Sequence, residues 1–293
     1  MSDIDLAQLR ALAAVVDEGS FDAAASALHL TPSAVSQRIK ALEHSAGRVL
    51  VRRTKPTEAT EAGHAYLRLA RQVESLVRDV RVEVDPAEQN LPTIPLAVNG
   101  DSLATWVLPA LASLSGTAYF DVRREDEGRT ADLLRSGTVM AAITSDAAAV
   151  QGCRSTRLGV MRYRPMASPA FAATWFADGV NAVSLAAAPV VVFDRSDDLQ
   201  DAYLRQRSRR RLAPPRQHVP ASSQFADAIA LGLGWGMLPK EQSGSREAAG
   251  ELVNIDPGRH VDVTLHWQQW TLQTPALEAT AKAIREAART HLT

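Results

Sequence analysis

The sequence predicts an α/β protein with a small, mainly helical domain at its N-terminus, a long linking helix and a two-lobed α/β domain. Three observations support this prediction. The first sixty residues hold three closely spaced helical patterns, residues 61–84 form one uninterrupted helical pattern, and the rest of the chain alternates between strand-like and helix-like segments. With 293 residues, the chain is long enough for two domains that each bury a core.

Composition places the chain among ordinary globular proteins. Apolar residues make up 46% of the sequence, charged residues make up 22%, and the formal net charge is −1. The first twenty residues lack a basic leader and carry acids within their apolar stretch, so we expect no signal peptide, no membrane span and a cytoplasmic location. The single cysteine, Cys153, excludes an internal disulfide and a cysteine-based zinc cluster, and is either a packed residue or a redox sensor.

Three helices are predicted in the first domain, residues 1–60. Apolar residues at helical spacing begin at Leu6 and stop at Gly19. Ser20 is expected to cap a short second helix, because its hydroxyl can accept a bond from a free backbone amide of the first turn. After a tight turn, Thr31 is expected to cap a third helix that begins at Pro32, since proline fits the first turn of a helix.

The third helix has an apolar face and a separate polar face formed by Ser33, Ser36, Gln37 and Lys40. Serine and glutamine can hydrogen-bond to base edges in the major groove, and lysine can meet phosphate. The alternative is a solvated helix face, which most surface helices have. Charge favours DNA, because residues 31–60 hold six Lys or Arg against two acidic residues, a net charge of +4.

The segment SFDAAASALHLTPSAVSQRIKALEHSAGRVLVRR (residues 20–53), followed by TEATEAG, resembles the winged helix-turn-helix of the LysR-type transcriptional regulators. The resemblance extends from about Leu6 to Gly63. It implies that the helix from Pro32 contacts the major groove and that the wing touches the flanking backbone or the minor groove. The expected DNA-binding residues are Ser20, Thr31, Pro32, Ser33, Ser36, Gln37, Arg38, Lys40, Arg52, Arg53, Lys55 and Pro56.

Residues 61–84 are predicted to form a long linker helix. Tyr66, Leu69, Val73, Leu76 and Val80 recur at alternating spacings of three and four, the pattern of a coiled-coil seam. We interpret this helix as a dimerisation element, a role that it also has in the resembling family, in a homodimer or homotetramer. Two copies would present two recognition helices to an operator with approximate two-fold symmetry. The alternative is a seam that packs only against its own domain.

Residues 85–95 contain three prolines and no periodicity, which predicts a hinge. Residues 96–293 then alternate between strand and helix patterns, which favours an α/β fold with mostly parallel sheets. A break in the middle suggests two lobes, lobe I at about 96–167 and 268–293 and lobe II at about 168–267. This organisation resembles the effector domain of LysR-type regulators, which is built like a small periplasmic solute-binding protein.

The elements of this domain are predicted from short β-rich runs and longer helical patterns. The predicted strands are Ile94–Val98, Tyr119–Arg123, Met140–Thr144, Tyr163–Ser168, Val190–Phe193, Gln217–Val219, Trp235–Leu238 and Val261–Trp267. The predicted helices are Leu103–Leu114, Thr130–Ser136, Leu199–Arg210, Ser223–Leu231 and Ala276–His291.

Ligands of open α/β sheets gather at the carboxyl ends of strands and at helix N-termini. The first strand ends in Asn99, followed by Asp101 and by Ser102, which can cap the next helix. Acidic residues also follow other strands, for example Glu125 and Asp194. Several carboxylates that converge on one cleft would favour a cationic ligand, whereas isolated ones are usually solvated loop residues.

The motifs VNGDSLATWVLPAL, REDEGRT, LLRSG, APVVVFDRSDDLQDAYL, FADAIALGLGWGMLP, GELVNIDPG and LHWQQW resemble the LysG/ArgP subgroup of LysR-type regulators. Members of that subgroup sense basic amino acids and control exporters of lysine or arginine. The resemblance implies that Ser102 and Thr105 meet the α-carboxylate of the effector, and that acids including Asp227 meet its cationic end. The subgroup often has alanine at the position of Gly100. The expected effector-binding residues are Asn99, Asp101, Ser102, Thr105, Glu125, Thr144, Asp194, Ser222, Phe225 and Asp227.

The predicted function is therefore a sequence-specific transcriptional regulator that responds to lysine or arginine, uses no cofactor and controls an amino-acid exporter gene. Its expected partners are an operator in double-stranded DNA, the effector and other copies of itself, with RNA polymerase as a candidate. Alternatives are a LysR-type regulator with another effector, a replication-origin binder, and a solute-binding or enzymatic α/β protein.

No sequence motif supports the enzymatic alternative, because the P-loop, G-x-S-x-G, H-E-x-x-H and C-x-x-C patterns are missing. The glycines of 232–236 follow a helix and precede a strand, so they predict a helix C-cap and turn and not a dinucleotide loop. The arginine-rich stretch 205–211 is either a contact for DNA or a partner, or a solvated basic loop.

Overall fold

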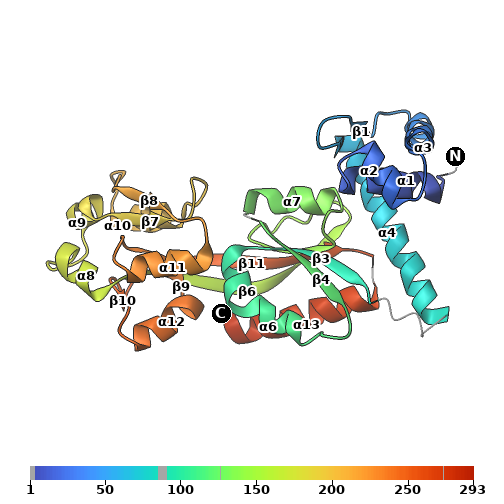
Figure 1. Cartoon of the computed structure of the whole chain (residues 1–293). Helices are drawn as coiled ribbons and strands as arrows, with labels where there is room; N and C mark the ends of the chain where they lie inside the picture. The colour runs from blue at the N-terminus through green and yellow to red at the C-terminus, as the bar shows by residue number, and fades with distance from the viewer. Residues whose placement is uncertain (1–3, 85–90, 126, 273) are drawn as a thin grey trace.

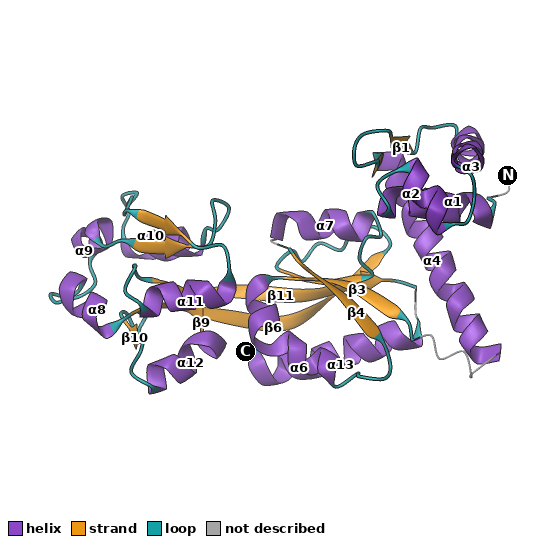
Figure 2. Cartoon of the chain, in the orientation of Figure 1, coloured by secondary structure: helices purple, strands orange, loops and turns teal. Residues whose placement is uncertain are grey.

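The computed structural model describes residues 4–84, 91–125, 127–272 and 274–293. A helical domain sits at one end, helix α4 descends beside it, and an elongated α/β domain extends away in two lobes (Figure 1). Strands run along the middle of this domain, with helices on its outside (Figure 2). Among the described residues, no helix combines the length and the hydropathy that crossing a membrane requires.

The N-terminal domain has the three predicted helices. They are α1 (Leu6–Asp17), α2 (Phe21–Ala27) and α3 (Pro32–Ala46). The predicted caps are confirmed, since the Ser20 hydroxyl accepts from the amide of Ala23 and the Thr31 hydroxyl accepts from the amide of Ala34, each at 3.2 Å. Gly47 ends α3 in the left-handed conformation with φ 64°, which glycine adopts without steric cost.

A two-stranded wing follows, and the linker helix packs directly under it. The elements are β1 (Val51–Arg52), β2 (Glu58–Ala59) and α4 (Glu61–Val84). A Cβ placed on Gly63 would lie 1.9 Å from the carbonyl oxygen of Leu50, so only glycine lets α4 approach the wing this closely.

The hinge prediction is only partly testable, because residues 85–90 lie outside the described residues. Residues 93–95 already belong to strand β3, so the strand begins earlier than the predicted hinge ends.

The main sheet has the strand order β10-β6-β11-β5-β3-β4, and β9 also pairs with β6. Its strands are β3 (Thr93–Val98), β4 (Tyr119–Arg124), β5 (Ala141–Thr144), β6 (Cys153–Ala167), β9 (Gly236–Pro239), β10 (Val253–Asn254) and β11 (Val261–Trp270). The strand β3 is parallel to β4 and β5, whereas β6 is antiparallel to β9, β10 and β11, and β11 is antiparallel to β5. The expectation of mostly parallel sheets is therefore wrong.

The antiparallel pairing comes from two long strands that pass between the lobes. The strand β6 runs over 15 residues, although only its last part was predicted, and it pairs with β11 from Cys153↔Trp270 to Tyr163↔Val261. At one end, β11 also pairs with β5 of lobe I, and at the other end β6 pairs with β9 and β10 of lobe II. Two antiparallel strands thus form the shared spine of both lobes (Figure 2).

Helices cover both lobes. Those of lobe I are α5 (Gly100–Ser102), the π-helical turn η1 (Leu103–Val107), α6 (Leu108–Ala112), α7 (Glu127–Arg135) and α13 (Pro275–His291). Lobe II contains α8 (Pro169–Trp175), α9 (Ala182–Ala187), β7 (Val190–Val192), α10 (Leu199–Arg207), β8 (Arg216–His218), α11 (Ser222–Ala230) and α12 (Lys240–Ala248). The helices α8, α9 and α12 were not predicted. The first two have seven and six residues, too few turns to show a periodic apolar stripe, and the nine residues of α12 include no large apolar side chain.

Two helix ends of the effector domain can be compared with the sequence prediction. The helix expected from Leu103 begins at Gly100, and Asn99 caps it by accepting the amide of Ser102 at 2.8 Å, so Ser102 is not the N-cap. The glycine-rich turn is confirmed as a helix end, since Gly232 has φ 84° and the Leu233 amide donates to the carbonyl of Ala228.

The main core of the effector domain extends into both lobes. One buried cluster joins β3, β5 and α13 of lobe I, through the spine strands β6 and β11, with β7 and α10 of lobe II, and two smaller clusters lie beside it. Trp267 and Trp270 of β11 are each 1% exposed. They are three residues apart in the strand and therefore point to opposite faces of the sheet, so both faces of the spine are buried here. A separate cluster holds the N-terminal domain together with the first part of α4.

Candidate DNA interface and effector site

The outward face of α3 is accessible. Val35, Ile39 and Leu42 are fully buried against α1 and α2, so the opposite face of the helix points outward. On that face Ser33, Gln37 and Lys40 are exposed, while Ser36 and Arg38 are half-buried. Thr31 and Pro32 are exposed at the start of the helix. These residues form a polar, cationic surface of the size and shape that enters a major groove.

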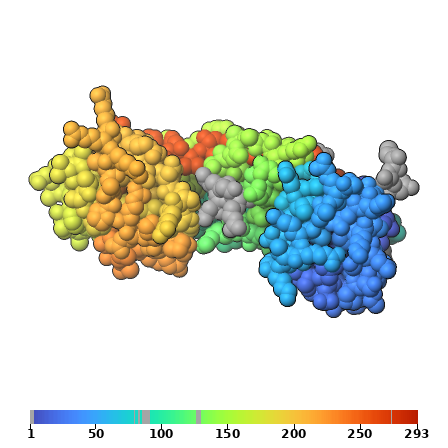
Figure 3. Space-filling model, turned by 90° about the horizontal axis from the view of Figure 1, so that it is seen from above, coloured from blue at the N-terminus to red at the C-terminus, as the bar shows by residue number. Residues whose placement is uncertain are grey.

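The wing carries more positive charge beside α3. Arg52, Arg53, Lys55 and Pro56 are all exposed, and Arg52 pairs with Glu58 at 3.4 Å. Ser20, half-buried, serves as the cap of α2. The whole predicted DNA-binding set therefore lies on α2, α3 and the wing, at one end of the molecule (Figure 1, Figure 3).

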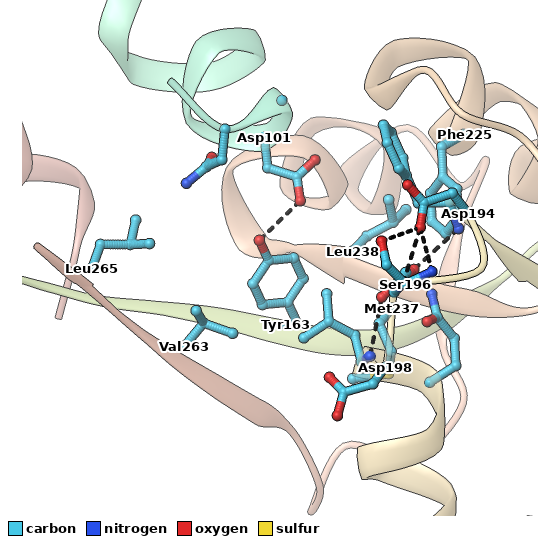
Figure 4. Close-up of a pocket in the computed structure, with 16 residues that line it drawn as sticks. Asp101, Tyr163, Asp194, Ser196, Asp198, Phe225, Met237, Leu238, Val263 and Leu265 are labelled. Atoms are coloured by element: carbon cyan, nitrogen blue, oxygen red, sulfur yellow. Dashed lines mark hydrogen bonds between the residues drawn. The ribbon is translucent and has the colours of Figure 1, made fainter. Parts of the chain in front are cut away.

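A cavity of about 490 Å³ lies between the lobes. Figure 4 shows that side chains from both lobes and from the spine surround it. Its polar wall is formed by Asn99, Asp101, Tyr163, Asp194, Ser196, Asp197, Asp198 and Gln200, and its apolar wall by Phe193, Leu199, Phe225, Met237, Leu238, Val263 and Leu265, with Gly100 between them. A cavity of this volume matches small-molecule sites in proteins.

All the charged residues of this wall are acidic. The wall includes the four aspartates Asp101, Asp194, Asp197 and Asp198, and none of its residues is a lysine, arginine or histidine. Asp198 is exposed and pairs with Arg205 at 3.3 Å. Carboxylates gathered in a partly closed space create a negative field that attracts a cation.

The four aspartates are held by local and long-range hydrogen bonds. Asp101 accepts from the Tyr163 hydroxyl at 2.8 Å and from the Ser222 hydroxyl at 2.5 Å. Asp194 accepts from the amide of Ser196 at 2.7 Å. Figure 4 shows Asp101 bonded to the Tyr163 hydroxyl on one side and Asp194 beside Ser196 on the other, so carboxylates reach the cavity from both lobes.

Burial affects Asp197 most. Its two oxygens accept from the amides of Phe193 and Leu199, each at 3.0 Å, which ties together the loop after β7. Desolvation by burial raises the pKa of Asp197 above its ordinary value, these amides oppose the change, and the charge of Asp101 adds to it. A cation in the cavity would favour the ionised form.

Several predicted effector residues do meet in the structure. Asn99, Asp101, Asp194 and Phe225 line the cavity, and Ser222 reaches it through its bond to Asp101.

Four others are not part of the wall. Ser102 is fully buried, and its hydroxyl has no hydrogen-bond partner among the described residues. The Thr105 hydroxyl donates to the Asp101 carbonyl at 2.6 Å, and the buried Thr144 hydroxyl accepts from the amide of Asp146. Glu125, half-buried after β4, is not part of the wall.

Asp227 lies apart from the other predicted effector residues. It is not part of the cavity wall, and its carboxylate instead accepts from Arg246 of α12 at 2.5 Å. It lies five residues after Ser222 on the same helix, which is about 140° around the helix axis at 3.6 residues per turn. The two side chains therefore cannot face the same cavity.

Sequence reasoning missed several wall residues. Tyr163 was missed because the strand was predicted only from that residue onward and its hydroxyl meets Asp101 from 62 positions away. Asp197 and Asp198 stand in the motif DRSDD directly after β7, and the rule that ligands gather at strand ends would have included them.

The arginine-rich stretch divides into two parts. Arg205 pairs with Asp198, and Arg207 donates to the Val180 carbonyl at 2.5 Å. Arg209, Arg210 and Arg211 are exposed on the loop that follows α10.

The predicted seam of α4 also divides. Tyr66 and Leu69 pack against the core of their own domain. Further along the helix, Leu76 is 44% exposed and Val80 is 57% exposed. The first part of the seam therefore packs within its own domain, and the second part is exposed and could contact a partner.

A winged helix-turn-helix joined to a two-lobed domain that encloses an acidic cavity defines a DNA-binding protein with its own ligand-sensing domain. Comparison with known families agrees with this class. The family model described as bacterial regulatory helix-turn-helix protein, lysR family, matches residues 6–64, and the LysR substrate binding domain matches residues 88–289. The chain belongs to the LysR family. Its relatives are named transcriptional regulators, which decides against an enzyme.

Similar proteins extend over the whole chain. The lysine export transcriptional regulatory protein LysG of Corynebacterium efficiens is 42% identical over 291 residues, 97% of this chain and 98% of the relative. The crystal structure of ArgP from Mycobacterium tuberculosis superposes with a TM-score of 0.93 at 44% identity, covering 99% of both chains. Full-length LysG of Corynebacterium glutamicum with bound effector Arg superposes with a TM-score of 0.84 at 37% identity, again over 99% of both chains.

Proposed function

We propose that this protein is a transcriptional regulator that binds arginine or lysine between its lobes. Binding changes its affinity for an operator upstream of an amino-acid exporter gene. The observation that carries the proposal is the cavity wall, which has four aspartates and no basic residue. Such a wall favours a ligand with more than one cationic group over a neutral or acidic amino acid.

Carboxylates from both lobes suit the α-ammonium group and the side-chain cation of a basic amino acid. Asp101 would receive one cationic group and the aspartates of the β7–α10 loop the other, with the apolar wall against the methylene chain between them. The relatives support this assignment, because one is a LysG with bound Arg and another is named a lysine export regulator.

DNA recognition would use α3 and the wing. Gln37 and Ser33 would contact base edges, and Lys40, Arg52 and Lys55 would contact phosphates, which supplies affinity without sequence preference. Paired copies joined through the exposed part of α4 would place two recognition helices on one operator. The effector regulates DNA binding only if its affinity differs between two arrangements of this assembly.

The test is fluorescence anisotropy of the full-length protein on the DNA upstream of its own gene, with a scrambled duplex as control. Arginine, lysine and histidine are added separately, and glutamate serves as the acidic control. We expect arginine or lysine to change the affinity for the operator while glutamate has no effect. Specific DNA binding that ignores all three basic amino acids would contradict the effector assignment.

A further inference from the structure

A direct hydrogen bond joins the two lobes across the cavity. Asp101 follows β3 in lobe I, and Ser222 begins α11 in lobe II. The Ser222 hydroxyl also meets Gln242 of α12, whose amide nitrogen donates to it at 2.6 Å. Because that oxygen already accepts from the amide, its single proton is directed to Asp101, at 2.5 Å. The direction of the bond between the lobes is thereby fixed.

The remaining contacts at this edge also connect the lobes. The Arg124 guanidinium of lobe I lies 5.9 Å from the ring centroid of Phe193 in lobe II. Gly100, next to Asp101, faces Ser222 so closely that a Cβ built on Gly100 would lie 3.7 Å from the Ser222 Cβ. The two lobes therefore touch through Asp101 and its neighbours while the cavity remains open behind them.

We propose that Asp101 and Ser222 form a latch that holds the lobes closed, and that Ser222 and Gln242 are positioning residues for an effector that they need not touch. The inference rests on the proposed function for the identity of the effector. A carboxylate has about four lone-pair sites, and Ser222 and Tyr163 use two of them, so Asp101 can still accept bonds from a ligand's ammonium group. Both donors are neutral hydroxyls, so the charge of Asp101 stays available to a cation.

The latch affects affinity through the population of closed protein. A ligand that binds only when the lobes are closed has an apparent affinity that is reduced in proportion to the closed fraction. Loss of the Ser222 hydroxyl leaves the Gln242 amide and one oxygen of Asp101 without their shared partner, which favours opening. We therefore expect Ser222→Ala to bind arginine about tenfold more weakly or worse, the size of effect typical of a lost hydrogen bond to a charged group.

A substitution at Gly100 should have the opposite effect on lobe closure. Its backbone is outside the left-handed region, and a methyl group there would meet Ser222 Cβ and Arg124 Cδ at 3.7 Å, ordinary van der Waals contact. Gly100→Ala adds contact between the lobes only when they are closed. It should therefore increase the closed fraction and tighten arginine binding.

The first experiment measures closure without any effector. Spin labels are placed at exposed positions on each lobe through Thr117→Cys and Asp178→Cys in a Cys153→Ala background, and labelled protein is diluted with unlabelled protein so that each assembly carries one labelled chain. The distance distribution between the labels is then recorded by pulsed electron paramagnetic resonance. Ser222→Ala should lengthen and broaden the distribution, and Gly100→Ala should narrow it.

The second experiment measures arginine binding to the full-length variants by calorimetry. Ser223→Ala is the matched control, because Ser223 is the exposed neighbour on the same helix, and it should bind arginine like the unaltered protein. Ser222→Thr keeps the hydroxyl and should recover most of the affinity that Ser222→Ala loses. If Ser222 only stabilised the fold, keeping the hydroxyl would not restore arginine binding. Operator binding without effector reports that each variant is folded.

The outcomes separate the latch from the proposed function. If Ser222→Ala leaves the distance distribution unchanged, or affects it no more than Ser223→Ala does, the latch is overturned whatever the effector is. If the unaltered protein binds neither arginine nor lysine while Ser222→Ala still opens the lobes, the latch stands and the effector assignment fails.

Discussion

The guanidinium of Arg53 lies over the ring of Phe21, with its Cζ 4.4 Å from the ring centroid. The same side chain donates to the Ser36 hydroxyl at 3.3 Å. Arg53 belongs to the wing, Phe21 begins α2, and Ser36 stands on α3, so one cation joins the three parts of the DNA-facing surface. A cation–π contact at an exposed site contributes about 0.5–1 kcal/mol, enough to bias the position of the wing.

Arg53→Ala should weaken binding to every duplex, specific or scrambled, because it removes both a cation and the brace between wing and α3. The plot of log affinity against log salt should become shallower by about 0.9, the change expected for one lost phosphate contact. Anisotropy titrations at several salt concentrations measure both effects. Arg53→Lys should keep the salt slope because it keeps the charge, and an equal loss of slope in that variant would contradict the phosphate contact.

Gln37→Ala should act differently. Gln37 is exposed on the outward face of α3 and has no hydrogen bond among the described residues, so it is free to meet a base edge. We expect the preference for the operator over a scrambled duplex to fall by about 1–3 kcal/mol, while affinity for the scrambled duplex stays the same. An unchanged preference would remove Gln37 from the residues that recognise bases.

The N-terminal domain was predictable because its boundaries depend on local chemistry. Ser20 and Thr31 cap helices within three residues of themselves, and Gly47 ends α3 with its own backbone conformation. The effector domain was less predictable because its spine is long-range. The strands β6 and β11 pair between residues about a hundred positions apart, and nothing in the local pattern of residues 153–162 shows that partner.

The site shows the same division. Asn99, Asp101 and Asp194 follow strands, and the strand-end rule finds them. The bond between Asp101 and Ser222 joins residues 121 positions apart, so only the fold shows it. Asp227 was predicted beside the effector, but it lies off the cavity wall, because a sequence does not show which face of α11 meets the cavity.

Asp227→Ala should therefore leave arginine affinity within about twofold of the unaltered protein. The side chains of Asp227 and Arg246 are 49% and 29% exposed, so loss of their ion pair should cost at most about 1 kcal/mol of stability. Asp101→Asn, which keeps the shape and removes the charge, should weaken arginine binding about tenfold or more. Calorimetry of the two variants decides between the residues, and a large loss in Asp227→Ala would return that residue to the site.

Arginine binding should release a proton at acidic pH. The raised pKa of Asp197 means that, just above the ordinary value of 3.8, the folded protein holds a proton that the unfolded chain has lost. The contribution of Asp197 to the free energy of unfolding therefore falls as pH rises through that interval. A bound cation lowers this pKa, so arginine affinity should rise with pH over the same interval. Calorimetry in two buffers of different ionisation enthalpy measures the released proton, and Asp197→Asn should abolish the release.

The exposed part of the α4 seam should hold the assembly together. Leu76 and Val80 are 44% and 57% exposed in the single chain. Burying a large aliphatic side chain contributes about 1.5–3 kcal/mol, so covering them with a partner helix would stabilise the assembly. Leu76→Asn combined with Val80→Asn should halve the mass measured by light scattering, or reduce it further, and weaken operator binding, because the two recognition helices no longer bind together.

The control for this prediction is Val183→Asn, which changes a residue that is 80% exposed. Val183 belongs to α9, at the opposite end of the molecule from the linker helix (Figure 1). The substitution removes an exposed apolar group without touching the seam, so it should leave the mass and the operator affinity unchanged. Leu69 gives the complementary comparison, because it packs against the core of its own domain. Leu69→Ala should lower the melting temperature at unchanged mass. If the double variant instead kept its mass and lost stability, the whole of α4 would pack within one chain and the assembly would depend on another surface.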